Sequence, residues 1–208
     1  MYIRERKNMD ILLPLNQFRK ALEKYVIFNE DEWDLFISYL SFSTLKKKEH
    51  FVKEGKVCSD MGFIVSGSMR HYHLKDGEEV TGYFSFENEF TSSLKSYLTR
   101  QPACNYVQAL EDTTLILISY QQMQKMLSTP LLAYKMERFG RLLAEYVLIC
   151  YEDRMTSFIT QTPEERYLKM IETSGEIFQR IPQHYIANFL GITPVSLSRI
   201  KKRILHIH

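Results

Sequence analysis

The chain has 208 residues, of which 45% are hydrophobic, and its formal net charge at pH 7 is +2. This length suits one large domain or two small ones, and the apolar fraction is high enough for a buried core, which excludes a disordered chain. The near-neutral charge excludes a protein that is basic throughout. Cations nevertheless gather near the end, because residues 193–208 hold four of them and no acid. Charge alone fits either a nucleic-acid interface or a solvated helix end.

The three cysteines, Cys58, Cys104 and Cys150, lie far apart in the sequence. No pair has the spacing of a metal site, and the odd number argues against a disulfide framework, so three reduced thiols are expected. The apolar runs are too short to span a bilayer, and the chain does not begin with the apolar segment of a secretory signal. We therefore predict a cytoplasmic protein with no metal, no cofactor and no membrane partner.

Helical signals occupy the first forty residues. Apolar residues between residues 15 and 26 recur at helical spacing. Asn29, followed three residues later by Glu32, has the pattern of a capping box, which joins the first turn of a helix to the residue before it. We expect a helix over residues 30–40 to start there.

Short strand signals dominate residues 45–118. Asp76-Gly77 lies between two alternating runs, which is a strong hairpin signal. No long helices are interleaved with the strands, so a parallel α/β sheet is not expected. We predict an antiparallel β-roll, similar to a jelly roll. Its expected strands are residues 63–65, 69–74, 80–86, 106–110 and 115–118.

A long amphipathic helix is predicted after Pro130. Its apolar residues alternate spacings of four and three, which is the pattern of a coiled-coil seam over nearly three heptads. A helix packed on its own domain would show the same pattern. We interpret the stripe as a homodimer seam, with Gly140 allowing close approach of two helices. Its members are Leu132, Met136, Phe139, Leu143, Tyr146 and Cys150.

A further helix is expected to begin at Pro163, because proline is favoured at the first helical position. Ser174-Gly175 is expected to end this helix, and residues 176–181 are expected to form a short strand.

The segment that follows has the pattern of a helix-turn-helix. Ala187 is small where two helices must cross closely. Gly191, four residues later, suits a tight turn because glycine tolerates positive φ. Thr193 and Pro194 are the residue types preferred at the N-cap and at the first position of a second helix.

The exposed side of this second helix has the features of a major-groove reader. Short side chains at its N-terminal turn let the backbone approach the bases, and an Arg one turn further can form two hydrogen bonds with guanine. Basic and hydroxyl side chains around them suit phosphates. The predicted base-reading residues are Val195, Ser196 and Arg199, and the predicted phosphate contacts are Thr193, Ser198, Lys201, Lys202 and Arg203.

The order of these segments resembles the CRP/FNR family of transcription regulators over nearly the entire chain. The most specific part of the resemblance is residues 186–200, and residues 51–77 are similar to the family's roll with its turn glycines. On this resemblance, Arg199 falls at the position of the family's guanine-reading Arg, and Ser196 falls where a small hydroxyl residue is usual. Val195 replaces a usual Glu and Pro194 a usual Arg or Ser, so a different DNA sequence is expected.

The sensor segment departs from the family members that bind cyclic nucleotides. Those carry a Gly-Glu pair for the ribose and an Arg-Ser pair for the cyclic phosphate, whereas here Ser93 replaces the Glu, Ala103 the Arg and Cys104 the Ser. A buried phosphate without its Arg loses a charged partner, which argues against cyclic AMP as the effector. No cysteine cluster precedes the roll, which argues against an iron–sulfur sensor. The degenerate effector pocket is expected at Ser92, Ser93, Leu94, Ala103 and Cys104.

We thus predict an α+β protein with a cyclic-nucleotide-binding-like β-roll sensor (residues 1–128), a long dimerisation helix (129–160) and a helix-turn-helix domain (161–208). The predicted function is that of a homodimeric, sequence-specific transcription regulator and not of an enzyme. The predicted partners are a near-palindromic double-stranded DNA, a second copy of the chain, RNA polymerase and an unidentified small-molecule effector. Two alternatives are a cupin-like metal-dependent enzyme using His71, His73 and Glu78, and a ligand-binding adaptor that does not bind DNA.

Overall fold

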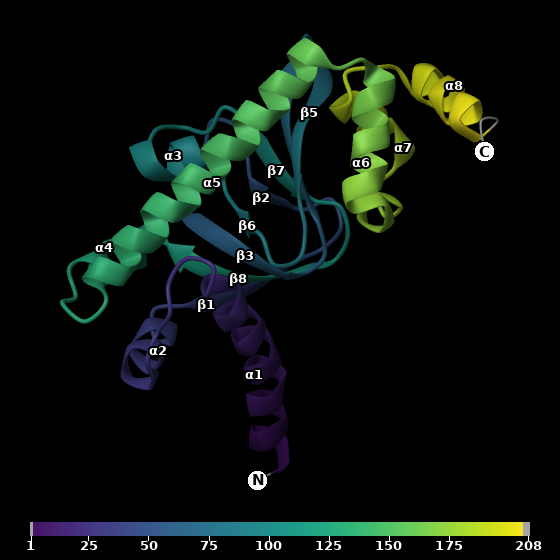
Figure 1. Cartoon of the computed structure of the whole chain (residues 1–208). Helices are drawn as coiled ribbons and strands as arrows, with labels where there is room; N and C mark the ends of the chain where they lie inside the picture. Colours follow the sequence, from purple (N-terminus) through teal and green to yellow (C-terminus); the bar gives the residue numbers. More distant parts are fainter. Residues whose placement is uncertain (1, 206–208) are drawn as a thin grey trace. The chain divides into compact units, whose positions relative to one another are not determined.

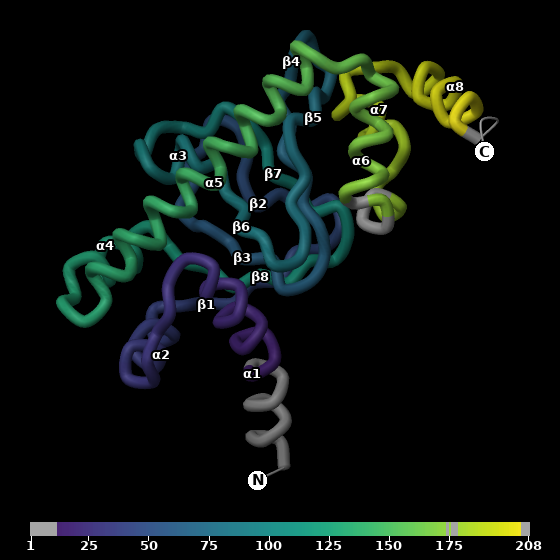
Figure 2. The backbone as a smooth tube through the Cα atoms, in the orientation of Figure 1, coloured from purple at the N-terminus to yellow at the C-terminus, as the bar shows by residue number. Residues whose placement is uncertain are grey.

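The computed structural model describes the backbone of residues 2–205 and the side chains of residues 12–173, 175 and 179–204. Two compact units make up the chain: residues 1–71 together with 84–145, and residues 72–83 together with 146–208. Figure 1 shows the helices and strands, and Figure 2 follows the backbone through both units. The three-segment division expected from the sequence stays a prediction.

The first unit begins with helices α1 (Tyr2–Leu22) and α2 (Glu30–Ile37). The predicted capping box is confirmed, because Asn29 Oδ1 accepts a hydrogen bond from Glu32 N at 2.9 Å and Asn29 N donates one to Glu32 Oε2 at 2.7 Å. The Glu32 carboxylate also pairs with Lys135. The hydrogen bond from Lys135 is the main reason why the pKa of Glu32 lies below its ordinary value.

Among the described residues, eight strands form the roll as two four-stranded sheets, in the orders β1-β8-β3-β6 and β2-β7-β4-β5. The pairings of β1 with β8, β3 with β8, β3 with β6 and β2 with β7 are antiparallel. The prediction of an α+β fold with an antiparallel roll is therefore confirmed. The strands are β1 (Ser41–Leu45), β2 (His50–Val52), β3 (Asp60–Ser66), β4 (Met69–Lys75), β5 (Glu78–Ser85), β6 (Phe90–Thr91), β7 (Tyr106–Ala109) and β8 (Thr113–Ser119).

Tight turns connect these strands. Asp76 and Gly77 have φ values of 54° and 82°, so the predicted hairpin between β4 and β5 is confirmed, with both turn residues in the left-handed region. Gly67, between β3 and β4, has a φ of 100°. A Cβ atom there would lie 2.4 Å from Thr113 Oγ1 and 2.8 Å from Asp112 O, so this turn requires glycine.

Three helices complete the roll segment: α3 (Leu94–Thr99), α4 (Tyr120–Leu127) and α5 (Ala133–Thr160). Aromatic side chains fill the core that they share with the roll. The ring of Phe18 lies 4.7 Å from that of Phe63, and the ring of Phe139 lies 5.2 Å from that of Phe90, between centroids. Burial of each such side chain contributes about 1.5–3 kcal/mol to stability.

This core changes the interpretation of the stripe along α5. Four of the six residues predicted to form a dimer seam, Leu132, Met136, Phe139 and Leu143, are 0–6% exposed and belong to the core of their own chain. The heptad spacing correctly indicates an apolar face, but the first half of that face covers the roll. These four side chains are therefore not available to a second copy, whereas Tyr146 is 45% exposed and Cys150 is half-buried.

The second unit contains the end of α5 and helices α6 (Pro163–Phe178), α7 (Gln183–Phe189) and α8 (Pro194–Leu205). Helix α6 begins at Pro163 as predicted, but the expected end at Ser174-Gly175 and the strand over residues 176–181 are wrong, because the helix continues to Phe178. Gly175 does not have the positive φ of a helix-ending glycine. A single interior glycine costs a helix only about 1 kcal/mol, which its other residues offset.

Candidate nucleic-acid interface

Helices α7 and α8 are joined by a turn at Gly191. Gly191 has a φ of 72°. The N–H of Gly191 donates to Asn188 O and the N–H of Ile192 to Ala187 O, both at 3.0 Å. These two bonds form a Schellman motif, which satisfies the last carbonyls of α7 and places its glycine in the left-handed region. The turn therefore has the glycine geometry that the sequence predicts.

Apolar side chains hold the two helices together. Ile186 of α7, its C-cap residue Leu190, and Leu197 and Ile200 of α8 are all buried, and each is at most 5% exposed. Ala187 is fully buried in the same contact, where a larger side chain would separate the helices. The packed side of α8 is thus apolar, and its opposite side is left for other contacts.

The start of α8 is fixed by its cap. Thr193 Oγ1 accepts a hydrogen bond from Ser196 N at 3.1 Å, as an N-cap does, and Pro194 is the first helical residue. Such a cap contributes about 1 kcal/mol. The first turn carries no acidic residue, so the positive end of the helix dipole is not compensated locally.

The three residues predicted to read bases lie on the solvent side of α8. Val195 is 61% exposed, Arg199 is exposed, and Ser196 is half-buried. The hydroxyl of Ser196 lies 3.0 Å from that of Thr193, so the two share a hydrogen bond. No hydrogen bond or ion pair joins the guanidinium of Arg199 to any other described residue. The arrangement can present one cation, one apolar side chain and a pair of hydroxyls to a ligand.

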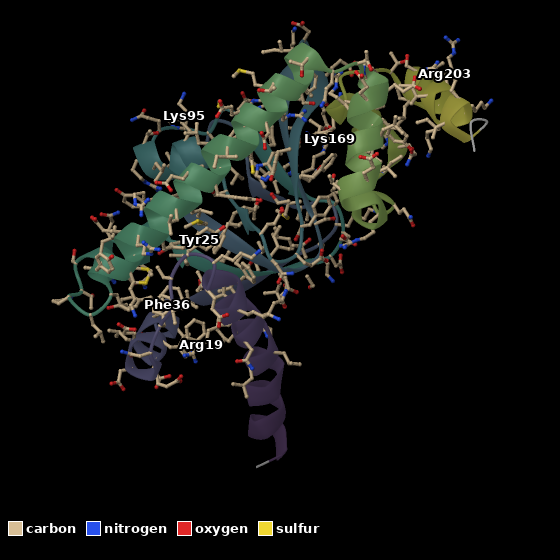
Figure 3. All side chains as sticks on the ribbon, in the orientation of Figure 1. Arg19, Tyr25, Phe36, Lys95, Lys169 and Arg203 are labelled. Atoms are coloured by element: carbon tan, nitrogen blue, oxygen red, sulfur yellow. The ribbon has the colours of Figure 1, made fainter. Side chains whose placement is uncertain are left out.

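The predicted phosphate contacts divide into two groups. Ser198 and Lys202 are exposed, as is Thr193. Lys201 instead donates to Gln183 Oε1 at 2.9 Å, and Arg203 forms an ion pair with Glu164 of α6. Figure 3 labels Arg203 on α8. These two cations therefore also hold α8 to its neighbours, a role that spacing along the sequence does not indicate.

Two arginines and a phenylalanine support the end of α7. Arg154 Nη2 donates to Phe189 O at 2.9 Å, and Arg166 Nη2 donates to Leu190 O at 2.8 Å. Both guanidinium groups stack on the ring of Phe158, with their Cζ atoms 4.8 and 4.3 Å from its centroid. Burial, followed by the charge of Arg166, lowers the pKa of Arg154 to about 10. This cation–π stack, which the sequence analysis missed, places two donors at the last carbonyls of α7.

The predicted effector-pocket residues lie around the start of α3. Ser93 is 5% exposed and donates through Oγ to Asn105 Oδ1 at 2.6 Å, and Ala103 is 4% exposed. Cys104 is exposed, while Ser92 and Leu94 are half-buried. None of the five predicted pocket residues carries a charge.

A polar cluster inside the roll involves His71, one of the three residues of the alternative metal site predicted from the sequence. His71 Nε2 lies 3.0 Å from Ser85 Oγ and 3.1 Å from Thr91 Oγ1, so the imidazole joins strands of both sheets. Among the described residues, no group of three or more His, Cys, Asp or Glu side chains could hold a metal ion. None of the described helices is both long and apolar enough to cross a membrane.

A second apolar stripe runs along the end of α5. Leu148, Tyr151, Met155 and Ile159 are between 60% and 76% exposed. They follow one another at spacings of three and four, which places them on one face of the helix. Spacings of three, four and four are helical, so periodicity could have found this stripe as well as the predicted seam.

Comparisons with known proteins agree with this fold. Residues 42–129 match the family model described as cyclic nucleotide-binding domain. No curated protein matches the sequence. Among solved structures, the c-di-GMP responsive global regulator CLP of Xanthomonas campestris is 13% identical, with a TM-score of 0.68 over 86% of this chain and 92% of that one.

Two further structures are similar over most of their length. A CooA variant of Carboxydothermus hydrogenoformans is 14% identical, with a TM-score of 0.63 over 92% of this chain and 85% of that one. FixK2 of Bradyrhizobium japonicum is 19% identical, with a TM-score of 0.62 over 80% of this chain and 85% of that one. The likeness shows a shared fold, in which an antiparallel β-roll is followed by a long helix and further helices.

Proposed function

We propose that the chain is a sequence-specific DNA-binding transcription regulator of the CRP/FNR type, not an enzyme, and that α8 enters the major groove. The observation that carries the proposal is the exposed side of α8, where Arg199 has no bonded partner among the described residues. A guanidinium one turn into a capped helix can form two hydrogen bonds with guanine O6 and N7. One structural neighbour, CLP of Xanthomonas campestris, is a global regulator, which supports the same class.

Neighbouring side chains extend this interpretation. Val195 is 61% exposed beside Arg199 and offers methyl groups to a thymine methyl. Ser196 and Thr193 offer hydroxyls, and the exposed Ser198 and Lys202 suit phosphates. Lys201 and Arg203 reach phosphates only if they leave Gln183 and Glu164, so the loss of these contacts offsets part of what they add to affinity.

The chain acts as a homodimer in this proposal, through the exposed stripe at the end of α5. Leu148, Tyr151, Met155 and Ile159 form an apolar seam that a second copy of the same helix would bury. A twofold pair of reading helices contacts half-sites about one DNA turn apart, so the preferred site is a near-palindrome. RNA polymerase and a small-molecule effector other than cyclic AMP are further proposed partners, and the proposed location is the cytoplasm.

The test is selection of bound duplexes from random DNA, followed by fluorescence anisotropy on the selected near-palindrome. Arg199→Ala should weaken binding by about 1–3 kcal/mol and relax the preference at one base pair. Lys202→Ala, one turn away, should weaken all sequences alike and reduce the salt slope by about 1. Lys95→Ala on α3 is the charge control. Equal affinity of Arg199→Ala and the unmodified chain, or binding without salt dependence, would contradict the proposal.

A further inference from the structure

The end of α7 is held at three consecutive residues by three different segments of the second unit. Phe189 O accepts from Arg154 of α5, and Leu190 O accepts from Arg166 of α6. The residue before them, Asn188, contacts the β4–β5 hairpin, whose residues 72–83 belong to this same compact unit. The first two anchors come from the two helices that precede α7 in the sequence. The third comes from a segment more than a hundred residues away.

The contact at Asn188 uses both ends of its carboxamide. Nδ2 donates to Glu79 O at 2.8 Å, and Oδ1 accepts a hydrogen bond from the N–H of Thr81. Glu79 and Thr81 are two residues apart on β5, the edge strand of its sheet. A donor and an acceptor directed at alternate residues of an edge strand reproduce the bonding of a neighbouring strand. The amide thereby fixes the position of α7 along the hairpin as well as its distance from it.

Both strands of the hairpin continue along the polypeptide into the other unit. Strands β4 and β5 run from the far end of the hairpin into residues 69–71 and 84–85, which pair within the roll's sheets. His71 and Ser85, at the roll ends of these strands, are joined to each other through the imidazole. The strands that carry Glu79 and Thr81 are therefore continuous in the chain with the strands of the roll.

We propose that the β4–β5 hairpin is a positioning element for the α7–α8 pair, and that Asn188 is the positioning residue that joins them. The inference rests on the proposed DNA-binding function. By holding α7 in one orientation, the carboxamide removes conformational freedom that binding to DNA would otherwise have to remove. Loss of the contact weakens DNA binding without changing any residue that faces the bases.

The experiment alters the contact from both sides in the full chain. Asn188→Asp has the same shape but replaces the donor to Glu79 O with an acceptor, and Asn188→Ala removes both groups. Thr81→Pro removes the N–H that Asn188 accepts, at an edge-strand position where proline is tolerated, and Thr81→Ala keeps that N–H as the matched control. If Thr81→Pro does not fold, the two Asn188 variants still decide the result.

Binding to the selected duplex should weaken about tenfold in Asn188→Asp, Asn188→Ala and Thr81→Pro, and stay unchanged in Thr81→Ala. The Asn188→Ala, Thr81→Pro double variant should be no weaker than either single variant, because both remove the same contact. Unchanged or tighter binding by the Asn188 variants, or additive losses in the double variant, overturns the inference.

A second readout does not depend on DNA. The Thr81 amide should exchange its hydrogen at least tenfold faster in Asn188→Ala than in the unmodified chain, because its acceptor is gone. An unchanged exchange rate would show that the Thr81 N–H does not bond to Asn188 in solution. If the unmodified chain fails to bind any selected duplex, the proposed function is wrong and the role of Asn188 in DNA binding falls with it. The exchange rate still decides whether hairpin and helix are joined.

Discussion

Replacement of Gly191 by alanine tests how firmly the turn between α7 and α8 is fixed. The φ of Gly191 is 72°, and an alanine held in the left-handed region costs about 1–2 kcal/mol. The new Cβ would lie 3.1 Å from Phe158 Cε1, so that ring must move by a few tenths of an ångström. Both Arg154 and Arg166 stack on this ring, so its movement disturbs two donors at the end of α7. We expect Gly191→Ala to lower the free energy of unfolding by about 1–2 kcal/mol.

Urea unfolding followed by circular dichroism measures this loss as a lower midpoint at unchanged slope. Gly140→Ala is the matched control, because a Cβ at that exposed helical position meets nothing within 4 Å. That control should gain about 0.5–1 kcal/mol, since alanine is the better helix former. Gly191→Asn should lose less than Gly191→Ala, because asparagine tolerates the left-handed region. A Gly191→Ala chain as stable as the unmodified one would refute the reasoning.

Three further predictions concern the dimer, the stability of the fold at low pH and the effector. In sedimentation, Leu148→Asp should be a monomer, because its carboxylate would enter the proposed apolar seam. The control Lys95→Asp should stay a dimer. A dimer formed by Leu148→Asp would exclude this seam. The pKa of Glu32 lies below its ordinary value of 4.5, so its contribution to stability is present above that pH and is lost as the pH falls through the folded-state pKa. Glu32→Gln should therefore make the free energy of unfolding fall less steeply with decreasing pH below 4.5. If the slope of that curve is unchanged, the Lys135 pair contributes nothing to stability. Calorimetric titration with cyclic AMP should give no binding heat, since Ala103 stands where a phosphate-binding Arg is expected, and a stoichiometric heat would overturn that interpretation of the pocket.

Features that depend on neighbouring residues were readable from the sequence. The capping box at Asn29 and Glu32, the hairpin at Asp76-Gly77 and the glycine turn at Gly191 each involve a few adjacent residues whose conformations are limited by their own side chains. The exposed face of α8 follows in the same way, because a helix of known start and period places Val195, Ser196 and Arg199 by geometry alone.

Features that depend on distant residues were not readable in this way. Helix α5 carries two apolar stripes at helical spacing, and no local property distinguishes the stripe that meets Phe90 in the roll from the stripe that stays exposed. The sequence indicates a phosphate contact at Arg203, whereas the structure shows that Arg203 forms an ion pair with Glu164 of α6. Nothing in the sequence around Asn188 indicates a special role. Its hydrogen bonds with Glu79 and Thr81 on the edge of β5 are visible only in the structure.

The sequence by itself thus determined the antiparallel roll, most of the longer elements and the surface that α8 presents, because short-range sterics, hydrogen bonding and periodicity decide them. Only the tertiary structure decided which apolar face is core, which cations are already paired and which segments hold α7. Each of these depends on where residues distant in the chain meet, and such meetings are set by packing of the whole fold rather than by local preference.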